Sequence, residues 1–283
     1  MLTATAGLSE SDLSEIADLE RRAVDHDGGR LKLEWSSLRG RSGEQIDDLL
    51  WRDGDRLVGF LGFYSFGSPD LELAGMVDPA VRRRGIGTAL LAAALPIAHE
   101  RGFTRALLVT PRSTPTGAAF AHANHATLEH SEHFLALDAT PTSGPLDPGL
   151  VLRLATEADA AEVARILADG FGQPARNFAI SNTPAESTMA IERAGRIVGT
   201  VRLSRRGDTA GIYGLAVDPP YQGQGIGRDV LNRVCRDLRA DGAAQVTLEV
   251  ATDNDRALDL YLSVGFERRA TEDYFELPTP ATM

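Results

Sequence analysis

The chain has 283 residues, of which 43% are hydrophobic and 24% are charged, and these proportions are ordinary for a soluble globular protein. The length fits one large domain or two of about 140 residues, a size that buries an adequate core. The formal net charge of −11 argues against nucleic acid as a partner, because phosphate binding needs a basic face. An acidic surface is compatible with a cationic substrate such as an amine.

Signals for a membrane or for export are not found in the sequence. No apolar run reaches the roughly 20 residues that span a bilayer. Residues 1–10 have no basic residue and no apolar core, unlike a secretory signal. We therefore expect a cytoplasmic protein without a membrane partner. Cys235 is the only cysteine, which excludes an intramolecular disulfide and a cysteine-rich metal site, and its amphipathic helical surroundings predict a buried, inert thiol.

An internal repeat determines the predicted architecture. Matching segments recur at a constant spacing of 140 residues: Arg56–Gly59 and Arg196–Gly199, Val77–Pro79 and Val217–Pro219, Gly85–Gly87 and Gly225–Gly227, Gly102 and Gly242. Such in-register matches predict two tandem copies of one domain. Residues 138–149 are rich in Pro, Gly, Ser and Thr, as linkers are. We predict an N-terminal domain over 1–138, a linker over 139–149 and a C-terminal domain over 150–283.

Both copies show the same predicted elements in the same order. A helix comes first, with Ser9 and Thr156 as the predicted N-caps. Two strands follow around short turns at 53–55 and 194–195, and then a strand that ends in Val-Asp-Pro. A Gly-rich turn, a helix, a strand, a short helix and a final strand complete each copy. Pro96 should kink or shorten the helix after the first Gly-rich turn. This order predicts an α/β (α+β) sheet domain, made twice.

The Gly-rich turn is a candidate anion site. In the second copy it reads Gln222-Gly223-Gln224-Gly225-Ile226-Gly227-Arg228. Glycines let the backbone approach a ligand closely, and the first N–H groups of the following helix have no internal partners and lie at the positive end of its dipole. A pyrophosphate would fit there. The spacing differs from the Rossmann fingerprint, and a P-loop would need a lysine that is absent.

Both turns match the Q/R-x-x-G-x-G/A signature of the GCN5-related N-acetyltransferases (GNAT), as Gln222–Gly227 and Arg82–Gly87. The preceding Val-Asp-Pro is also typical of that family. The chain therefore resembles two tandem GNAT folds over nearly its whole length, each with a mixed, mostly antiparallel sheet flanked by helices. The resemblance implies acetyl-CoA, or another acyl-CoA, as the cofactor.

In that family the amides of the turn hold the CoA pyrophosphate, and the preceding strand pairs with the pantetheine arm. The cofactor contacts implied in the second copy are Leu215, Ala216, Val217, Gln222, Gly223, Gln224, Gly225, Ile226, Gly227, Arg228 and Asn254. Those implied in the first copy are Met76, Val77, Arg82, Arg83, Arg84, Gly85, Ile86, Gly87 and Thr88.

The segment from Leu248 to Phe266 resembles the second motif of the family, L-E-V-x-x-x-N-x-x-A-x-x-L-Y-x-x-x-G-F. Alternation along the strand places Glu249 on the face opposite its apolar neighbours. The resemblance implies that Tyr261 is the general acid, or a hydrogen-bond donor to the CoA thiolate, and that Glu249 is the base. Structural alternatives are a core aromatic for Tyr261, a solvated or ion-paired strand residue for Glu249 and a helix cap for Asn254.

The first copy departs from the second motif. Val109 stands opposite Glu249, and a one-residue gap then places Phe120 opposite Tyr261 and Ser113 opposite Asn254. We therefore predict that the first copy is catalytically silent. It either binds CoA through residues 82–88 or only packs against the second copy. Its histidines, at 122, 125, 130 and 133, lack the spacing of a metal site, and we interpret them as a solvated loop.

Two function classes follow. The first is an N-acetyltransferase that acts from the second copy on a primary amine, and the second is a CoA-binding sensor or partner-binding module without turnover. The tandem layout also resembles that of the mycothiol synthases, although these carry a carboxylate on the strand before Val-Asp-Pro and residues 212–215 supply none. Aminoglycosides, polyamines and protein N-termini stay open as acceptors. We expect residues 170–187 and the loop near 268–274 to form the acceptor site; the sequence does not indicate the oligomeric state.

Overall fold

The computed structural model describes residues 1–66, 70–141, 147–172, 179–183 and 185–278. Contacts divide the chain into two compact units. Unit 1 comprises Met1–Glu132 and Ala270–Met283, and unit 2 comprises His133–Arg269. Each unit is described by itself.

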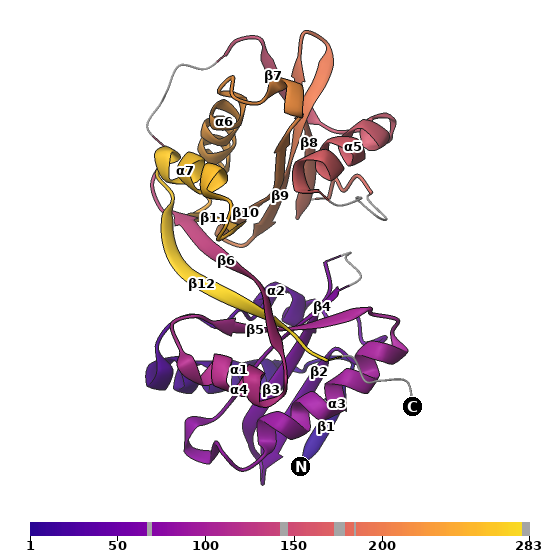
Figure 1. The fold of residues 1–283 in the computed structure, drawn as a ribbon, viewed down its shortest axis with the longest axis vertical. Helices are drawn as coiled ribbons and strands as arrows, with labels where there is room; N and C mark the ends of the chain where they lie inside the picture. The colour runs from indigo at the N-terminus through magenta and orange to yellow at the C-terminus, as the bar shows by residue number, and fades with distance from the viewer. Residues whose placement is uncertain (67–69, 142–146, 173–178, 184, 279–283) are drawn as a thin grey trace. The chain divides into compact units, whose positions relative to one another are not determined.

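Unit 1 is a mixed sheet with helices on both faces (Figure 1). In chain order it contains β1 (Leu2–Thr5), α1 (Glu10–Asp27), α2 (Trp35–Arg39), β2 (Asp48–Asp53), β3 (Arg56–Tyr64), β4 (Asp70–Val77), η1 (Pro79–Val81), α3 (Ile86–Glu100), β5 (Arg105–Pro111), α4 (Pro115–Ala123) and the first half of β6 (Thr127–Leu137). The end of β12 (Glu267–Glu276) completes the unit, and the strand order is β1-β2-β3-β4-β5-β12. Neighbours are antiparallel except β4 and β5, which are parallel.

Unit 2 repeats this plan. It contains the second half of β6, then β7 (Leu150–Leu154), η2 (Glu157–Asp159), α5 (Ala160–Phe171), β8 (Glu186–Arg193), β9 (Arg196–Arg206), β10 (Thr209–Val217), η3 (Pro219–Tyr221), α6 (Ile226–Ala240), β11 (Gln245–Ala251), α7 (Asp255–Val264) and the start of β12 (Glu267–Glu276). The strand order is β6-β11-β10-β9-β8-β7, with β10 and β11 parallel. Two mixed, mostly antiparallel folds were predicted from the sequence, and this prediction is confirmed.

The predicted helix starts are confirmed as well. Ser9 accepts a hydrogen bond from the amide of Asp12 and forms a capping box with it, and Thr156 forms the same box with Asp159. Pro96 lies inside α3, yet α3 and α6 both have 15 residues, so the predicted shortening does not occur. Pro96 faces solvent, and tertiary packing of the opposite, apolar side of α3 outweighs the lost hydrogen bond.

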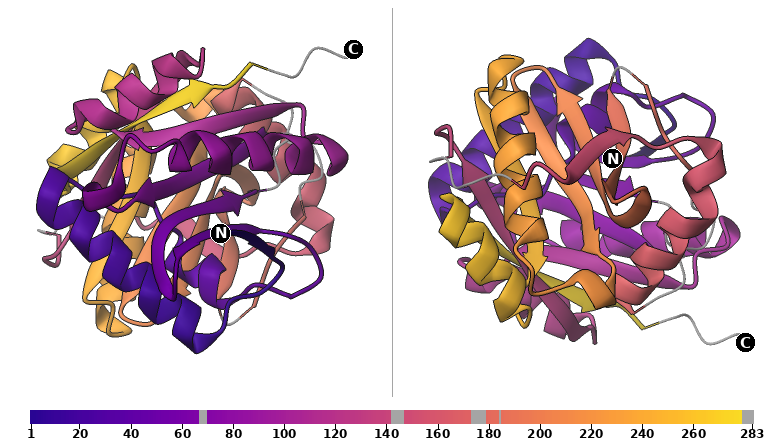
Figure 2. Two further views of the ribbon diagram at one scale, coloured as in Figure 1. Left: turned by 90° about the horizontal axis from the view of Figure 1, so that it is seen from below. Right: turned by 90° about the horizontal axis from the view of Figure 1, so that it is seen from above.

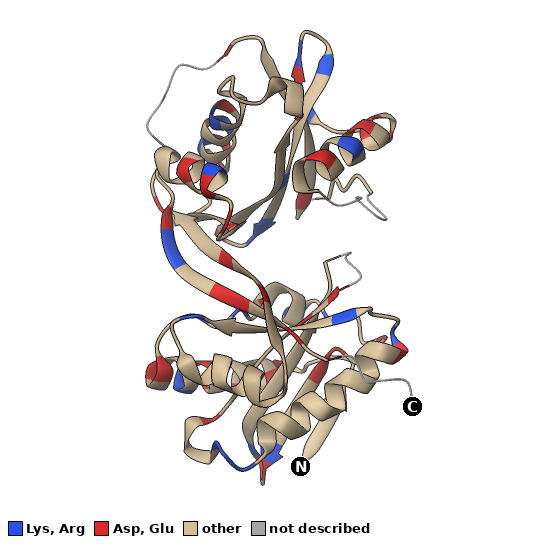
Figure 3. Ribbon diagram, in the orientation of Figure 1, with Lys and Arg blue, Asp and Glu red and all other residues tan. Residues whose placement is uncertain are grey.

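The last strand of the chain belongs to unit 1. Glu272–Glu276 of β12 pairs antiparallel with Pro111–Leu107 of β5, and Leu277 donates its amide to Ala106 at 2.9 Å. Tyr274 enters one core of unit 1, and Phe275 and Leu277 enter the other. Basic residues at 268 and 269 and acidic residues at 272, 273 and 276 follow one another along β12 (Figure 3).

This division differs from the boundaries predicted from the sequence, which placed residues 270–283 in the C-terminal domain and residues 133–138 in the N-terminal one. The chain enters unit 2 within β6 and returns to unit 1 within β12, so the two final strands are exchanged between the repeats. Residues 139–149, predicted as a linker, join β6 to β7, and 142–146 lie outside the described residues.

Each unit has its own core. In unit 2 the core packs α6 and α7 against β10, β11 and β6 and includes Cys235, which is fully buried as predicted. Burial raises the pKa of that thiol to about 12. In unit 1, α3 and α4 cover one face of the sheet and α1 and α2 the other (Figure 2). Within the described parts of the chain, no helix is both long and apolar enough to cross a membrane.

Candidate active site

A β-bulge distinguishes the central strand of unit 2. Tyr213 of β10 pairs with Arg202 of β9 and Ala216 pairs with Thr200, so Gly214 and Leu215 face a single residue. The extra residue leaves backbone groups unpaired in the ladder and bends the strand. In unit 1 the equivalent pairing of β4 with β3 runs without a shift.

The two parallel strands of unit 2 also separate at this level. β10 pairs with β11 only over Thr209–Gly211, although β10 continues to Val217. The backbone of Leu215 to Val217 is therefore not paired with β11. These are the residues that the sequence predicted to pair with a pantetheine arm, and the structure leaves that edge of β10 without a described partner strand.

The Gly-rich turn of unit 2 follows β10 directly. Gly223 and Gly225 adopt left-handed conformations, with φ of 76° and 81°, and a Cβ added at either would meet nothing within 4 Å. Gly225 is the N-cap of α6 and has no side chain to satisfy the first amides of that helix. Gln222 anchors the turn, since its side-chain amide donates to the carbonyl of Val217 at 2.9 Å. An open cradle of amides at a 15-residue helix is suited to a phosphate group.

The turn of unit 1 has the same backbone geometry. Gly85 has a φ of 80°, again with open space around it, and Arg83 takes the left-handed place of Gly223 with a φ of 65°. Arg82 Nε donates to Val77 O at 3.0 Å, as Gln222 does to Val217, and its other nitrogens bind Asp27. The same turn geometry is therefore built twice, and the turn in unit 1 contains three arginines, Arg82 to Arg84, of which Arg82 is paired with Asp27.

The predicted cofactor contacts differ in how far their side chains are exposed. The side chains of Met76, Ile86, Ala216 and Ile226 are buried. Val77, Leu215 and Val217 are partly buried and pack against their cores. Arg84, Thr88, Gln224 and Arg228 are exposed, and Gln224 accepts a hydrogen bond from Arg193 at 2.8 Å. Gly227 and Gly87 lie where their helices pack closely, since an added Cβ would come within 3.2 Å of Leu260 and 3.1 Å of Phe120.

Tyr261 lies on α7, next to the helix residue that packs on Gly227. Its ring is partly buried against the core of unit 2 and meets the edge of Phe266 at a centroid distance of 6.1 Å. Burial raises the pKa of Tyr261 above its ordinary value, so the phenol stays protonated at neutral pH. Its hydroxyl makes no hydrogen bond to any described residue, which leaves it able to donate to a ligand.

Glu249 lies on β11, where burial alternates strictly along the strand, and it is on the face opposite the buried Leu248 and Val250, as predicted. Gly211 pairs with Thr247, so alternation along the two strands puts Tyr213 and Glu249 on the same face of the sheet, and Tyr213 pairs with Arg202 on β9. The three side chains thus share one face of the sheet. Tyr213 is 50% exposed and lies over Gly211, where an added Cβ would come within 2.7 Å of its ring.

Asn254 caps α7, because its side chain accepts a hydrogen bond from the amide of Ala257 at 3.1 Å. The helix-cap alternative for this residue is therefore confirmed. A structural role that the sequence did not predict belongs to the aspartate of Val-Asp-Pro. Asp218 binds Arg165 of α5 at 3.0 Å, and Asp78 binds Arg22 of α1 at 2.9 Å, so each aspartate ties the turn to the first helix of its unit.

The first copy lacks both candidate catalytic groups, but its alignment with the second copy does not contain the predicted one-residue gap. The spacing of 140 residues continues through α4 and α7: the N-caps are Thr114 and Asn254, and the left-handed residues that end the helices are His125 and Gly265. Ala126 donates to the carbonyl of Ala121 as Phe266 donates to that of Tyr261. Ala121, fully buried, therefore stands at the place of Tyr261, and the pairings of Phe120 and Ser113 predicted above are wrong.

The segments predicted to form the acceptor site are only partly described. Residues 173–178 and 184 lie outside the described residues, and the remainder contains Asn182, whose side chain donates to the carbonyl of Ala155 at 2.7 Å. Residues 268–274 form part of strand β12 and not a loop, and those from Ala270 onward belong to unit 1.

The predicted solvated histidine loop is wrong for two of its four residues. His130 and His133 lie on strand β6, where His133 is buried, whereas His122 near the end of α4 and His125 in the following turn are exposed. Among the residues that the structure describes, no three His, Cys, Asp or Glu side chains come together as metal ligands.

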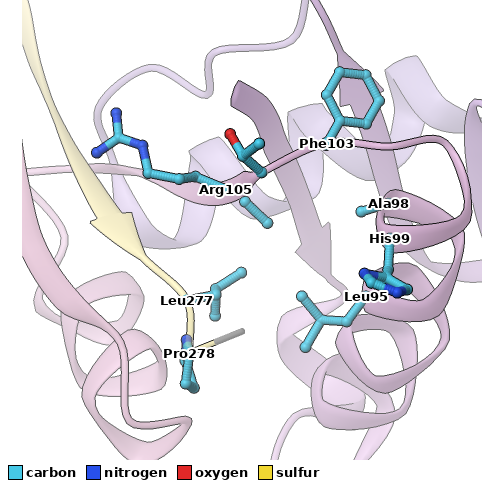
Figure 4. Close-up of a pocket in the computed structure, with 9 residues that line it drawn as sticks. Leu95, Ala98, His99, Phe103, Arg105, Leu277 and Pro278 are labelled. Carbon is cyan, nitrogen blue, oxygen red and sulfur yellow. The ribbon is translucent and has the colours of Figure 1, made fainter. Parts of the chain in front are cut away.

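A small pocket lies in unit 1 at the far end of α3 from the Gly-rich turn (Figure 4). It is lined by Leu95, Ala98, His99, Phe103, Thr104, Arg105, Ala106, Leu277 and Pro278. The lining is mostly apolar and includes none of the predicted cofactor or catalytic residues, so the pocket does not belong to the candidate site.

Two α/β units, each with a Gly-rich turn after a strand that parts from its parallel neighbour, define a tandem acetyltransferase-type fold. The chain belongs to the acetyltransferase (GNAT) family, whose sequence model matches residues 12–123 and 160–266, one range in each repeat. It is therefore an acyltransferase, and enzymes of this family generally take the acetyl group from acetyl-CoA.

The chain is similar to curated members of the family. It is 30% identical over 238 residues to the mycothiol acetyltransferase of Brachybacterium faecium, covering 75% of this chain and 69% of that protein. It is 42% identical over 90 residues to the N-alpha-acetyltransferase RimI of Mycobacterium tuberculosis, covering 30% of this chain and 55% of that protein. A solved tandem GNAT protein from the clavulanic acid biosynthesis pathway matches its fold with a TM-score of 0.71 at 18% identity, covering 100% and 99% of the two chains.

Proposed function

We propose that unit 2 catalyses the transfer of an acetyl group from acetyl-CoA to a primary amine, and that unit 1 is catalytically silent. The observation that carries this proposal is the difference between the repeats. In unit 2, strand β10 is bulged and separates from its parallel neighbour β11 before the Gly-rich turn. The same unit carries Glu249 on β11 and Tyr261 on α7. Unit 1 has an unbroken register, with Val109 and Ala121 at the corresponding positions.

The residues of unit 2 fit the cofactor. The open space above Gly223 and Gly225 would admit the pyrophosphate to the first amides of α6, and the unpaired edge of β10 from Leu215 to Val217 would hold the pantetheine arm. The turn is exposed, and Gln222 ties it to the end of β10 through the carbonyl of Val217. Acetyl-CoA supplies the acetyl group as an activated thioester.

Two side chains would move protons. Glu249 accepts a proton from the acceptor ammonium, directly or through water, so that the amine becomes nucleophilic. Tyr261, held protonated by burial, donates its hydroxyl proton or a hydrogen bond to the sulfur that leaves. Each such contribution is typically worth about 10²–10⁴ in rate.

Steady-state release of CoA thiol in the presence of a panel of primary amines tests the proposal. The panel should contain a polyamine, an aminoglycoside, a peptide with a free N-terminus and the cysteinyl-inositol-glucosamine precursor of mycothiol. We expect turnover that requires acetyl-CoA and an amine and that is lost in a Glu249→Gln, Tyr261→Phe double variant. Tight CoA binding without turnover on the whole panel would instead favour the sensor hypothesis.

A second, narrower candidate is acetylation of the mycothiol precursor. The similarity to a mycothiol acetyltransferase over 75% of the chain favours it. Against it, residues 212–215 carry no carboxylate, and the residue that precedes the bulge is the half-exposed Tyr213. A kcat/KM for that precursor at least about 100-fold above the other amines would establish this acceptor, since such a ratio is about 3 kcal/mol of discrimination.

A further inference from the structure

Lys32 is the only lysine of the chain, and its side chain is buried in unit 1. It lies in the connection between α1 and α2 and is only 6% exposed. A lysine is almost never buried unless its ammonium group is paired, because desolvation of an unpaired charge is very costly. The partners of Lys32 therefore form a site that is made for an ammonium group.

Three elements supply these partners. The Nζ of Lys32 donates to the hydroxyl of Tyr274 on β12 at 2.5 Å and lies 3.3 Å from a carboxylate oxygen of Glu72 on β4. It also lies 5.0 Å from the centre of the Tyr274 ring. The Tyr274 hydroxyl in turn donates to Glu132 on β6 at 2.8 Å, and His130 stacks on the same ring at 4.2 Å. Carboxylate, phenol oxygen and aromatic ring are the groups that bind a primary ammonium.

The repeat relates this cluster to the acceptor side of the fold. Of the two segments predicted to bind the acceptor, 170–187 corresponds at the spacing of 140 to 30–47, which contains Lys32. The other segment, 268–274, belongs to unit 1 from Ala270 onward and contains Tyr274. Glu72 lies on the strand that parts from its parallel neighbour, one residue before the last paired residue, Leu73.

We propose that unit 1 contains a binding site for a primary ammonium group, formed by Glu72, Glu132 and Tyr274, and that Lys32 occupies it permanently. Calling it an acceptor site rests on the function proposed above, whereas the site itself does not. Because the chain supplies its own amine, a free amine cannot enter, and unit 1 is closed to an acceptor as well as lacking catalytic groups.

The proposed site and an ordinary buried ion pair predict different results when a free amine is added to a variant that lacks Lys32. The Lys32→Ala variant removes three methylenes and the ammonium, the equivalent of n-propylammonium. If the site is formed by the surrounding residues, that free cation should bind the variant and restore its stability. An ion pair that merely holds the chain together would leave no site once the lysine is removed.

Thermal unfolding of the full chain, followed by tryptophan fluorescence, is the test. Both tryptophans, Trp35 and Trp51, lie in unit 1, so the signal reports on that unit. We expect Lys32→Ala to lower its Tm by about 5 °C or more. At about 50 mM n-propylammonium chloride and a Kd of about 5 mM, Tm should rise by about 3–5 °C in the variant and not in the wild type.

Sodium chloride at the same ionic strength and the neutral 1-propanol are the matched controls. A rise with n-propylammonium alone supports the site. An equal rise in the wild type, an equal rise with either control, or no rise in the variant would overturn it.

A second measurement covers the case in which the variant does not fold. The wild type has two amines, Lys32 and the N-terminus, and acetylation by an N-hydroxysuccinimide ester is followed by intact mass. We expect one acetyl group on the folded protein and two on the unfolded protein. Lys32 reacting as fast as the N-terminus in the folded chain would refute the closed site.

Discussion

A matched pair of glycine substitutions separates the roles of the two anion cradles. Gly225 and Gly85 are the N-caps of α6 and α3, with φ of 81° and 80°, and a Cβ at either position would meet open space. The Gly225→Glu and Gly85→Glu variants therefore make the same local change in two copies of one turn. If unit 2 alone is catalytic, their effects on activity must differ although their effects on stability agree.

The expected magnitudes follow from this geometry. An L-residue in the left-handed region costs about 1–2 kcal/mol at either position, which lowers Tm by a few degrees. Arg83, already left-handed at φ 65°, shows that the turn tolerates such a residue. A carboxylate about 5 Å from a bound phosphate, at an effective dielectric constant of about 20, adds about 3 kcal/mol of repulsion, or more than about 100-fold in affinity.

Thiol-release kinetics and calorimetric titration with acetyl-CoA give the two readouts. We expect Gly225→Glu to raise the KM for acetyl-CoA at least about 100-fold and Gly85→Glu to leave turnover within about two-fold of the wild type. If both turns bind CoA, each variant removes one site from the titration. Full activity in Gly225→Glu, or an equal loss in Gly85→Glu, would refute the assignment of catalysis to unit 2.

Three further outcomes are expected. Tyr261→Phe should lower kcat by about ten-fold or more without changing CoA affinity. Because burial raises the pKa of Tyr261, the wild-type rate should decline through this group only in alkaline solution, and a decline near neutral pH would identify another acid. Glu249→Gln should lower kcat/KM for the amine by about 10² or more, and unchanged kinetics would place the base elsewhere. Deletion of residues 270–283 should unfold unit 1, because it removes the buried side chains of Tyr274, Phe275 and Leu277, and the burial of each contributes roughly 2–3 kcal/mol or more to stability. Tryptophan fluorescence would detect the unfolding, and a native signal would contradict the strand exchange.

The sequence was sufficient for the features that depend on local chemistry. The repeat, the helix caps at Ser9 and Thr156 and the glycine turns were predictable, because caps and left-handed residues are set by residue type at fixed offsets. The alternation that orients Glu249 was predictable for the same reason.

Two errors had physical causes. Phe120 was aligned with Tyr261 because both are aromatic, whereas the hydrogen bond from Ala126 to Ala121 shows that backbone position is conserved between the repeats and side-chain type is not. The exchange of the final strands could not be predicted, since β6 and β12 are the same element of a repeat and either fits either sheet by local pattern. Side-chain contacts within unit 1, such as those of Tyr274 with Lys32 and Glu132, distinguish the place of β12 in the sheet of unit 1 from the place of β6 in the sheet of unit 2.

Because of the exchange of β12, the sheet of unit 1 is completed by a strand that is synthesised after all of unit 2. Domains commonly fold as units, the N-terminal one first, while synthesis continues. Here the sheet of unit 1 lacks its last strand until residues 270–277 have been made, so the first half of the chain leaves the ribosome with the edge of β5 unpaired. An unpaired edge of this kind is a template for association with another chain. Pairing of residues 272–276 with β5 therefore also protects this edge from association with another chain.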